Sequence, residues 1–312
     1  MLVALAGGVG AARFLAGLVC AVPPTEVVAI VNTGDDDEFH GLHVSPDLDS
    51  VTYTLAGASN AAQGWGLEGE TFATLDALSR YDVPTWFRLG DKDLATHLYR
   101  TQRLRAGATL SEVTNEITRA WDLDLRLVPM TDDRVRTRIT VRREGGHTEE
   151  LAMQAWFVGE RAESPVASVR FDGAEHAHPA PGVLEALRTA DTIVICPSNP
   201  VISIGPILAV PGIRDALVAR RERVIGVSPI VGGAPVKGPA DRLMAPLGIA
   251  VSCVGVAAAY AEICGALVID EVDAHLASEV EATGVRAIVT DTMMRSTEIA
   301  TELARRTLAA VA

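Results

Sequence analysis

The chain has 312 residues, of which 48% are hydrophobic but only 4% aromatic, so its core must consist mainly of Ala, Val, Leu and Ile. A formal net charge of −13 argues against a nucleic-acid groove or an anionic membrane surface, although a metal ion or a few local cations can still attract a phosphorylated substrate. No apolar run reaches about 18 residues and no basic leader precedes one, so neither a membrane span nor a signal peptide is predicted. The four cysteines lie among apolar residues without a C-x-x-C spacing, and we expect buried, reduced thiols in a cytoplasmic protein.

The first predicted strand, residues 2–6, runs through a glycine turn into a helix. The turn contains Gly7, Gly8 and Gly10. A strand, a glycine turn and a helix place backbone N–H groups where an anion can bind. Arg13 stands where a dinucleotide fingerprint has its third glycine, and no Gly-Lys-Ser/Thr follows, so neither that fingerprint nor a Walker loop is complete. Arg13 could reach a phosphate or pair with a surface acid.

The second predicted strand, residues 27–31, precedes the most acidic stretch of the chain. This stretch holds Asp35, Asp36, Asp37, Asp47 and Asp49. Carboxylates packed this densely repel one another, so a hard divalent cation that holds a phosphate is the favoured explanation. The alternative is a solvated loop beside a helix N-terminus, which favours acids on electrostatic grounds.

Ser45-Pro46 predicts the start of a helix that runs to about residue 57, with Ser45 as its cap. Residues two apart on a helix point about 200° apart, so Asp47 and Asp49 cannot both face one ion if the first turn is regular. We expect one of them to bind at the site while the other caps or positions it.

Residues 65–121 are predicted to form a more polar, helical insertion on an α/β core. Its helices are predicted at residues 70–80, 92–105 and 110–121. Between the first two lie Trp86-Phe87 and Gly90-Asp91, which could line a pocket for a flat ring or form a satellite hydrophobic cluster. His97 and Arg100 share one helix face, either as substrate contacts or as part of a solvated face.

Residues 137–172 are predicted to form a β-rich addition, with strands at 137–143, 151–158 and 166–171. Strands then alternate with helices again. The strands are predicted at 192–196, 223–227, 249–254, 266–270 and 286–290, and the helices at 181–188, 211–220, 255–264 and 296–310. This alternation predicts an α/β, Rossmann-like fold with a three-layer, mostly parallel sheet, formed by residues 1–64 and 122–312.

Two further polar segments follow predicted strands of this core. Ser198-Asn199 comes directly after the strand at 192–196, and Lys237 lies in the glycine-rich loop 228–239, which could close over a phosphate or simply connect two elements. Ligands of such sheets bind at the carboxyl ends of the strands. The glycine turn, the acidic stretch and these two segments all fall at predicted carboxyl ends, so we expect them to form one site.

Several blocks of the sequence resemble the CofD/FbiA family, the 2-phospho-L-lactate transferases of coenzyme F-420 biosynthesis. The blocks are residues 6–15 (AGGVGAARFL), 32–36 (NTGDD), 46–50 (PDLDS), 86–97 (WFRLGDKDLATH), 197–208 (PSNPVISIGPIL) and 228–233 (SPIVGG). The resemblance covers nearly the whole chain. It implies a transferase in which the ribityl hydroxyl of the deazaflavin Fo attacks the phosphorus next to the lactyl or enolpyruvyl group of a guanosine-diphosphate-linked donor, and GMP leaves.

The resemblance also implies roles for individual residues. Magnesium is expected at Asp35, Asp36, Asp47 and Asp49, with Asp35 and Asp49 as first choices. The catalytic candidates are Asp35, Asp49 and Asp36, because one of the acids could also take the hydroxyl proton. Nucleotide and phosphate contacts are expected from Gly7, Gly8, Gly10, Arg13, Ser198, Asn199 and Lys237, and deazaflavin contacts from Trp86, Leu89, Gly90 and Asp91. The family suggests a homodimer.

Two other functions stay open at this point. A related branch of the superfamily binds a nucleotide-sugar and regulates metabolism without transferring a group, but it should lack the block at residues 86–91. An NAD-dependent oxidoreductase is disfavoured by Arg13 and by Asn32, which takes the place of the usual ribose-binding acid. The residues do not decide between a lactyl and an enolpyruvyl donor.

Overall fold

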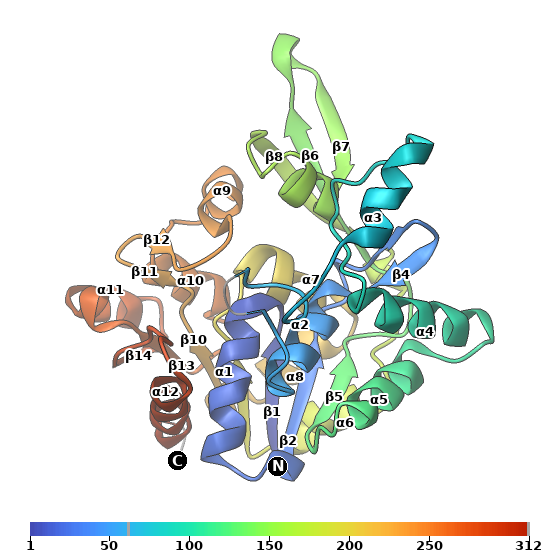
Figure 1. The fold of residues 1–312 in the computed structure, drawn as a ribbon. Helices are drawn as coiled ribbons and strands as arrows, with labels where there is room; N and C mark the ends of the chain where they lie inside the picture. Colours follow the sequence, from blue (N-terminus) through green and yellow to red (C-terminus); the bar gives the residue numbers. More distant parts are fainter. Residues whose placement is uncertain (61–62, 311–312) are drawn as a thin grey trace.

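A seven-stranded sheet forms the centre of the computed structural model, which describes residues 1–60 and 63–310 (Figure 1). Its strands are β1 (Leu2–Ala6), β2 (Val27–Val31), β5 (Arg126–Pro129), β9 (Thr192–Ile195), β10 (Val224–Val227), β13 (Ala266–Ile269) and β14 (Arg286–Val289). The order across the sheet is β14-β13-β10-β9-β1-β2-β5, and every adjacent pair is parallel. Buried runs such as Val27–Val31 suit this arrangement, because a parallel sheet is covered on both faces.

The strand order places a topological switch at β1. The chain goes from β1 to β2 on one side and later returns to β9 on the other, so Leu2 is in register with Val27 in β2 and with Thr192 in β9. Connections that leave β1 and β9 in opposite directions open a crevice beyond their carboxyl ends. The predicted Rossmann-like fold is confirmed, and the crevice lies where the glycine turn and Ser198-Asn199 were expected to meet.

Helices cover both faces of the sheet, which makes three layers. Alternate residues of β1 face the two sides: Val3 and Leu5 belong to one buried cluster, and Ala4 to the other. The cluster with Ala4 includes residues of α1 (Gly8–Ala21), α2 (Pro46–Leu55), α5 (Leu110–Ala120) and α12 (Thr297–Ala309). The cluster with Val3 includes residues of α6 (Val183–Thr189), α7 (Gly205–Ala209), α8 (Ile213–Val218), α9 (Ala240–Met244), α10 (Cys253–Tyr260) and α11 (Ala277–Ala282).

Helices α1 and α12 lie side by side (Figure 1). A side chain at Gly17 of α1 would collide with the backbone carbonyl group of Ala300 in α12, so the two helices touch at this glycine. None of the described helices is long and apolar enough to cross a lipid bilayer.

The remaining elements rise above the carboxyl edge of the sheet (Figure 1). Within residues 65–121 lie α3 (Ala73–Leu78) and α4 (Asp93–Arg105) in addition to α5. A separate antiparallel sheet, in the order β7-β6-β8, consists of β6 (Arg136–Arg142), β7 (Thr148–Ala152) and β8 (Val166–Asp172). Two ribbons complete the structure: β3 (Asp37–Phe39) with β4 (Leu42–Val44), and β11 (Ile230–Val231) with β12 (Ala234–Pro235).

Several predicted elements are wrong. No strand forms at 249–254, because the Ser252 hydroxyl accepts a hydrogen bond from the Gly255 N–H and starts α10 at Cys253. A strand was predicted at 151–158, but the observed strand β7 ends at Ala152. A π-helical turn, Ala155–Gly159, follows it. The edge strand β5 of the seven-stranded sheet has no counterpart in the prediction.

Two smaller expectations also fail. Cys20 is exposed at the end of α1, whereas the other three cysteines are buried, and all four are free thiols. Helix α2 does begin at Pro46, but the Ser45 side chain does not cap it, because its hydroxyl donates to the Asp36 carboxylate instead (2.7 Å).

Candidate active site

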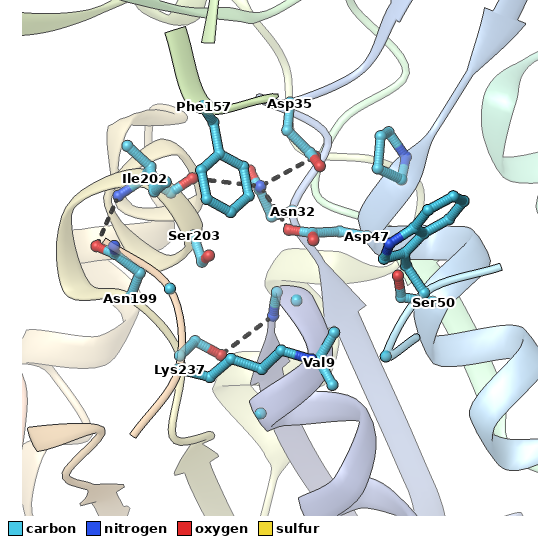
Figure 2. A pocket seen from close by; sticks show the side chains of 18 of the residues that line it. Val9, Asn32, Asp35, Asp47, Ser50, Phe157, Asn199, Ile202, Ser203 and Lys237 are labelled. Carbon is cyan, nitrogen blue, oxygen red and sulfur yellow. Dashed lines mark hydrogen bonds between the residues drawn. The ribbon is translucent and has the colours of Figure 1, made fainter. Parts of the chain in front are cut away.

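A cavity of about 560 Å³ opens at the carboxyl edge of the sheet, beside the switch at β1 (Figure 2). Most of the predicted site residues line it: Gly7, Gly8, Gly10, Arg13, Asp35, Asp47, Asp49, Trp86, Leu89, Ser198, Asn199 and Lys237. The other three predicted residues, Asp36, Gly90 and Asp91, are not part of this lining. The glycine turn, the acidic stretch, the insertion and the loops after β9 and β10 therefore do converge.

The glycine turn is closely packed against the loop after β9. A side chain at Gly7 would come within 2.7 Å of the Ser203 Cβ atom, and one at Gly10 would collide with the Pro197 carbonyl oxygen. The Gly7 N–H donates to the Ser198 hydroxyl (3.3 Å). No acid of α1 itself lies in its first turn, and although the Asp47 carboxylate contacts the Gly8 backbone, the remaining N–H groups at this helix N-terminus suit an anion.

We call the region between the N-terminus of α1 and the loop after β9 the anion cradle. Asn199 shapes the side of it that the loop after β9 provides. Its side-chain oxygen accepts hydrogen bonds from the N–H groups of Val201 (2.9 Å) and Ile202 (3.3 Å), which starts the π-helical turn Pro200–Ile204 (Figure 2). π-Helical turns are rare in proteins, and those that do occur are often found at functional sites. This turn and the other one, Ala155–Gly159, both contribute side chains to the cavity wall.

Asp35 and Asp47 face each other across the Asn32 amide (Figure 2). The Asn32 Nδ2 atom donates to Asp35 Oδ1 (3.2 Å) and to Asp47 Oδ2 (2.8 Å). Among the described residues, no Lys, Arg or His nitrogen lies within 4.0 Å of either carboxylate, unlike Asp36 and Asp49, which have such neighbours. The pair is thus held in place by a neutral amide and not by a counter-charge.

Burial has a large effect on the ionisation of these two acids. Burial, followed by the charges of Asp47 and Asp36, raises the pKa of Asp35 well above its usual range, and the more distant Arg136 only partly opposes this. Burial raises the pKa of Asp47 to about 7, against the contacts with Asn32 and the Gly8 backbone. Both carboxyls are costly to ionise without a nearby cation.

Asp36 points away from the cavity. Its Oδ2 atom contacts the His43 Nε2 atom (3.0 Å) and accepts a hydrogen bond from the Ser45 hydroxyl (2.7 Å). These contacts join the acidic turn to β4 and to the start of α2. Asp36 therefore supports the loop that carries Asp35 and does not itself line the cavity.

Asp49 belongs to a second group of polar side chains, in which the negative charge is balanced by a positive charge of the protein itself. Its carboxylate forms a two-pronged ion pair with the buried Arg100 of α4, through both terminal guanidinium nitrogens. Burial alone would lower the pKa of Arg100, but the Asp49 charge more than offsets it, so this pKa is raised. Burial raises the pKa of Asp49, and Arg100 opposes the rise.

Three more side chains extend this second group. His97 lies with Nε2 at 3.1 Å from Asp93 Oδ2 and Nδ1 at 3.7 Å from Asp49 Oδ2, and the Tyr53 hydroxyl donates to Asp93 (2.6 Å). His97 and Arg100 are 1% and 2% exposed, so the alternative of a solvated helix face is wrong. The spacing of Asp93 and His97, four apart on α4, was the available signal for this pairing, and the sequence interpretation missed it.

The Asp49, Asp93 and His97 side chains could hold a metal ion, because they offer ligand atoms within 4.8 Å of one another. The Arg100 guanidinium, however, already occupies the Asp49 carboxylate. A divalent ion there would lie beside a buried positive charge. Asp35 and Asp47 lack such a neighbour among the described residues, so they suit a hard cation better.

Aromatic side chains form the wall that faces the acids. Trp65, Trp86 and Phe157 line the cavity and are 39%, 40% and 37% exposed. Trp86 lies edge-on to the rings of Phe39 and Phe87, which are stacked on each other (centroids 3.8 Å apart). A platform of accessible rings beside the cavity suits a flat aromatic ligand. Trp65 and Phe157 were not predicted for the site.

Gly90 and Asp91 have a structural position next to this wall. Asp91 accepts hydrogen bonds from two backbone N–H groups at the start of α3 (2.9 and 3.0 Å), and the Thr71 and Thr74 contacts lower its pKa. In return, Glu70 accepts from the Lys92 and Asp93 N–H groups at the start of α4, and its carboxylate leaves no room for a side chain at Gly90. The two segments thus cap each other's helices.

Arg13 and Lys237 place positive charge in the cavity wall, near each other. Burial, followed by the charge of Arg13, lowers the pKa of Lys237. The Lys237 ammonium lies against Gly64, so the loop after β10 reaches across the cavity to the segment before the insertion. No carboxylate of the described residues lies within 4.0 Å of either cation, which leaves both available to an anion.

Comparison with known proteins identifies the family. The chain matches the family described as "2-phospho-L-lactate transferase CofD" over residues 2–308. The phosphoenolpyruvate transferase of Streptomyces griseus subsp. griseus is 47% identical over 98% of this chain and 97% of its own length. The phosphoenolpyruvate transferase of Nocardia farcinica is 41% identical over 98% of this chain and 93% of its own length.

A solved structure shares the fold at much lower sequence identity. It is a member of the UPF0052 family from Bacillus halodurans, which aligns with a TM-score of 0.62 at 17% identity and covers 98% of this chain and 99% of that one. This likeness shows that the two chains share their fold. The chain belongs to the CofD family and is a transferase of phosphoenolpyruvyl or phospholactyl groups in coenzyme F-420 biosynthesis.

Proposed function

We propose that this enzyme transfers a phosphoenolpyruvyl group from a guanosine-diphosphate-linked donor to the terminal ribityl hydroxyl of Fo, and releases GMP. The proposal rests mainly on Asp35 and Asp47, two carboxylates without a counter-charge among the described residues. They lie in one cavity with the anion cradle and the aromatic wall. The choice of the enolpyruvyl donor rests on the relatives named as phosphoenolpyruvate transferases.

The donor diphosphate is assigned to the glycine turn. There the N-terminus of α1, the Ser198 hydroxyl and the cations Arg13 and Lys237 surround one region of the cavity. Backbone N–H groups and the helix dipole favour phosphate at such a turn. Lys237 comes from a loop with three glycines, so it can follow the donor as it binds.

The magnesium ion is assigned to Asp35 and Asp47. Both are buried carboxylates, their pKa values are raised, and they share one neutral hydrogen-bond donor, so a hard divalent cation would relieve their repulsion. When bound, the ion would neutralise the diphosphate and help GMP to leave. Asp49 is assigned a positioning role through Arg100, because the ion pair fixes α4 against the start of α2.

The deazaflavin ring is assigned to the aromatic wall, with Trp86 and Phe157 as its main contacts. In the transfer, the ribityl oxygen forms a bond to the phosphorus that bears the enolpyruvyl group, the bond from that phosphorus to the oxygen of the GMP phosphate breaks, and the hydroxyl proton passes to the departing GMP phosphate. Transfers of this kind depend mainly on alignment and charge neutralisation. The chain contributes both by holding the ring and the diphosphate on opposite sides of the acids.

The test is turnover with both synthetic donors, measured as GMP release and product mass in the presence of Fo and magnesium. We expect the enolpyruvyl donor to give the larger kcat/KM. Preference for the lactyl donor would overturn the choice of donor, and no GMP release with either would overturn the proposed reaction. We further propose a homodimer in the cytoplasm, which sedimentation equilibrium and cell fractionation would test.

A further inference from the structure

Gln154 lines the cavity but has no role in the reaction proposed for it. It precedes the π-helical turn Ala155–Gly159 and is only 5% exposed, yet it lines the cavity. Its amide forms no hydrogen bond with any residue in the described part of the chain. A buried amide that faces a cavity without a partner is costly to cover with an apolar ligand, so it favours a ligand with matching polar atoms.

The segment that carries Gln154 is firmly fixed. Trp156 is fully buried and its indole N–H donates to the Ser164 carbonyl (3.0 Å), while Gly159 lies against the Trp86 ring, 3.6 Å from an added Cβ atom. Gln154 and Phe157 are therefore presented together, beside Trp86. A site built on such supported side chains can position a ligand more accurately than a free loop.

We propose that Gln154 recognises the imide edge of the deazaflavin ring, a deepening that rests on the proposed function. The ring carries an N–H group flanked by two carbonyl groups. A primary amide can accept from that N–H and donate to one of the carbonyls, which gives two parallel hydrogen bonds. Phe157 and Trp86 contact the faces of the ring, and Gln154 fixes its rotation.

Guanine offers a similar N–H and carbonyl pair, so the shared chemistry is the amide edge of a ring. The position of Gln154 favours the acceptor over the nucleotide. It directly precedes the turn that carries Phe157, whereas the anion cradle is formed by the glycine turn and the loop after β9. Gln154 thus determines specificity for Fo and leaves the donor nucleotide to other residues.

The experiment compares the binding of Fo, of its N3-methyl analogue and of GDP to the full chain, followed by fluorescence for the two deazaflavins and by calorimetry for GDP. In the wild type we expect Fo to bind about tenfold more tightly than the analogue, because methylation removes the donor. Gln154→Met keeps the side-chain volume and should weaken Fo binding about tenfold. Gln154→Ala also makes room for the methyl group and should abolish the preference. GDP binding should be unchanged in both variants.

Phe157→Leu is the matched control on the adjoining turn. It should weaken Fo and its analogue equally, because it removes ring contact and not the amide. Retention of the preference in Gln154→Ala, or a loss of GDP affinity in both Gln154 variants, would overturn the assignment. Variants that do not melt as the wild type does are replaced by Gln154→Glu, which keeps an acceptor but repels the ring carbonyls and should also lose affinity. Absence of Fo binding to the wild type would instead overturn the proposed acceptor, and this inference with it.

Discussion

Asp47 and Asp49 lie two residues apart on α2, but the fold treats their charges in opposite ways. Asp49 faces Arg100 and His97, so its negative charge is compensated within the protein. Asp47 faces Asp35 and the neutral Asn32, so its charge is left for a ligand to compensate. Two residues within the first turn of α2 thus separate a group that stabilises the fold from a group that is available for function.

The largest expected effect concerns the uncompensated pair. Asp47→Asn should lower kcat by about 10³-fold, because it removes one of the two carboxylates assigned to the metal. The free energy of unfolding should stay the same or rise, since the substitution also removes repulsion with Asp35. Steady-state turnover and urea unfolding of the metal-free protein measure the two quantities. A large loss of stability would show that Asp47 belongs with Asp49 as a structural acid.

The compensated pair should behave in the reverse way. Arg100→Met leaves the buried Asp49 without its partner and should lower the free energy of unfolding by about 3–5 kcal/mol. A double variant, Asp49→Leu with Arg100→Met, should recover most of that stability, because neither charge is then left unpaired. Urea denaturation of the three proteins measures this. A loss below about 1 kcal/mol in the single variant would mean that Arg100 is not a structural counter-charge.

The pH dependence of stability sharpens the comparison further. The pKa of Asp47 is raised from 3.8 to about 7, so the folded state binds more protons than the unfolded state between these values. The free energy of unfolding of the metal-free protein should therefore fall by about 3 kcal/mol as the pH rises from 5 to 8, because the slope is about 1.4 kcal/mol per pH unit up to pH 7. Asp47→Asn should flatten this slope, and saturating magnesium should restore stability at pH 8. An unchanged slope in the variant would assign the effect to other groups.

The smallest expected effect concerns Asp36. Its carboxylate contacts Ser45 and His43 behind the cavity, so Asp36→Asn keeps the hydrogen-bonding shape and removes only one charge. We expect about a tenfold weaker activation by magnesium, typical of a residue that supports a ligand without touching the ion. A magnesium titration of turnover measures this. A loss as large as that of Asp47→Asn would place Asp36 at the ion.

The sequence predicted where the site lies in the fold better than it predicted which side chains pair with one another there. Buried strands followed by glycines or acids, as at Gly7 after β1 and Asp35 after β2, identify the carboxyl edge of a parallel sheet. Their convergence needed only the Rossmann-like order of strands. The short strand β5 was missed, because Arg126 begins it and its four residues carry too little apolar pattern to stand out.

The partners of the acids could not be predicted, because they depend on how distant segments pack. Arg100 and Asp49 are 51 residues apart and meet only when α4 packs against α2. Hydrophobic periodicity marks which face of α4 is polar, but it does not distinguish a buried polar face from a solvated one. Phe157 lies on a π-helical turn and Gln154 directly before it, and this segment was interpreted as a strand because it follows a polar turn and is rich in apolar residues.

The close contact between Gly17 and Ala300 affects the order in which the chain can complete its site during synthesis. Helix α1 carries the glycine turn, and α2 packs on it early in the chain, but its side at Gly17 is covered by α12, which begins only at Thr297 (Figure 1). On the ribosome, the apolar side of α1 must wait until α12 has emerged, and a chain that stops before Thr297 would expose that side to solvent. Burial of the first helix thus depends on the last described helix. A shortened transcript would therefore yield an aggregation-prone protein instead of a slower enzyme.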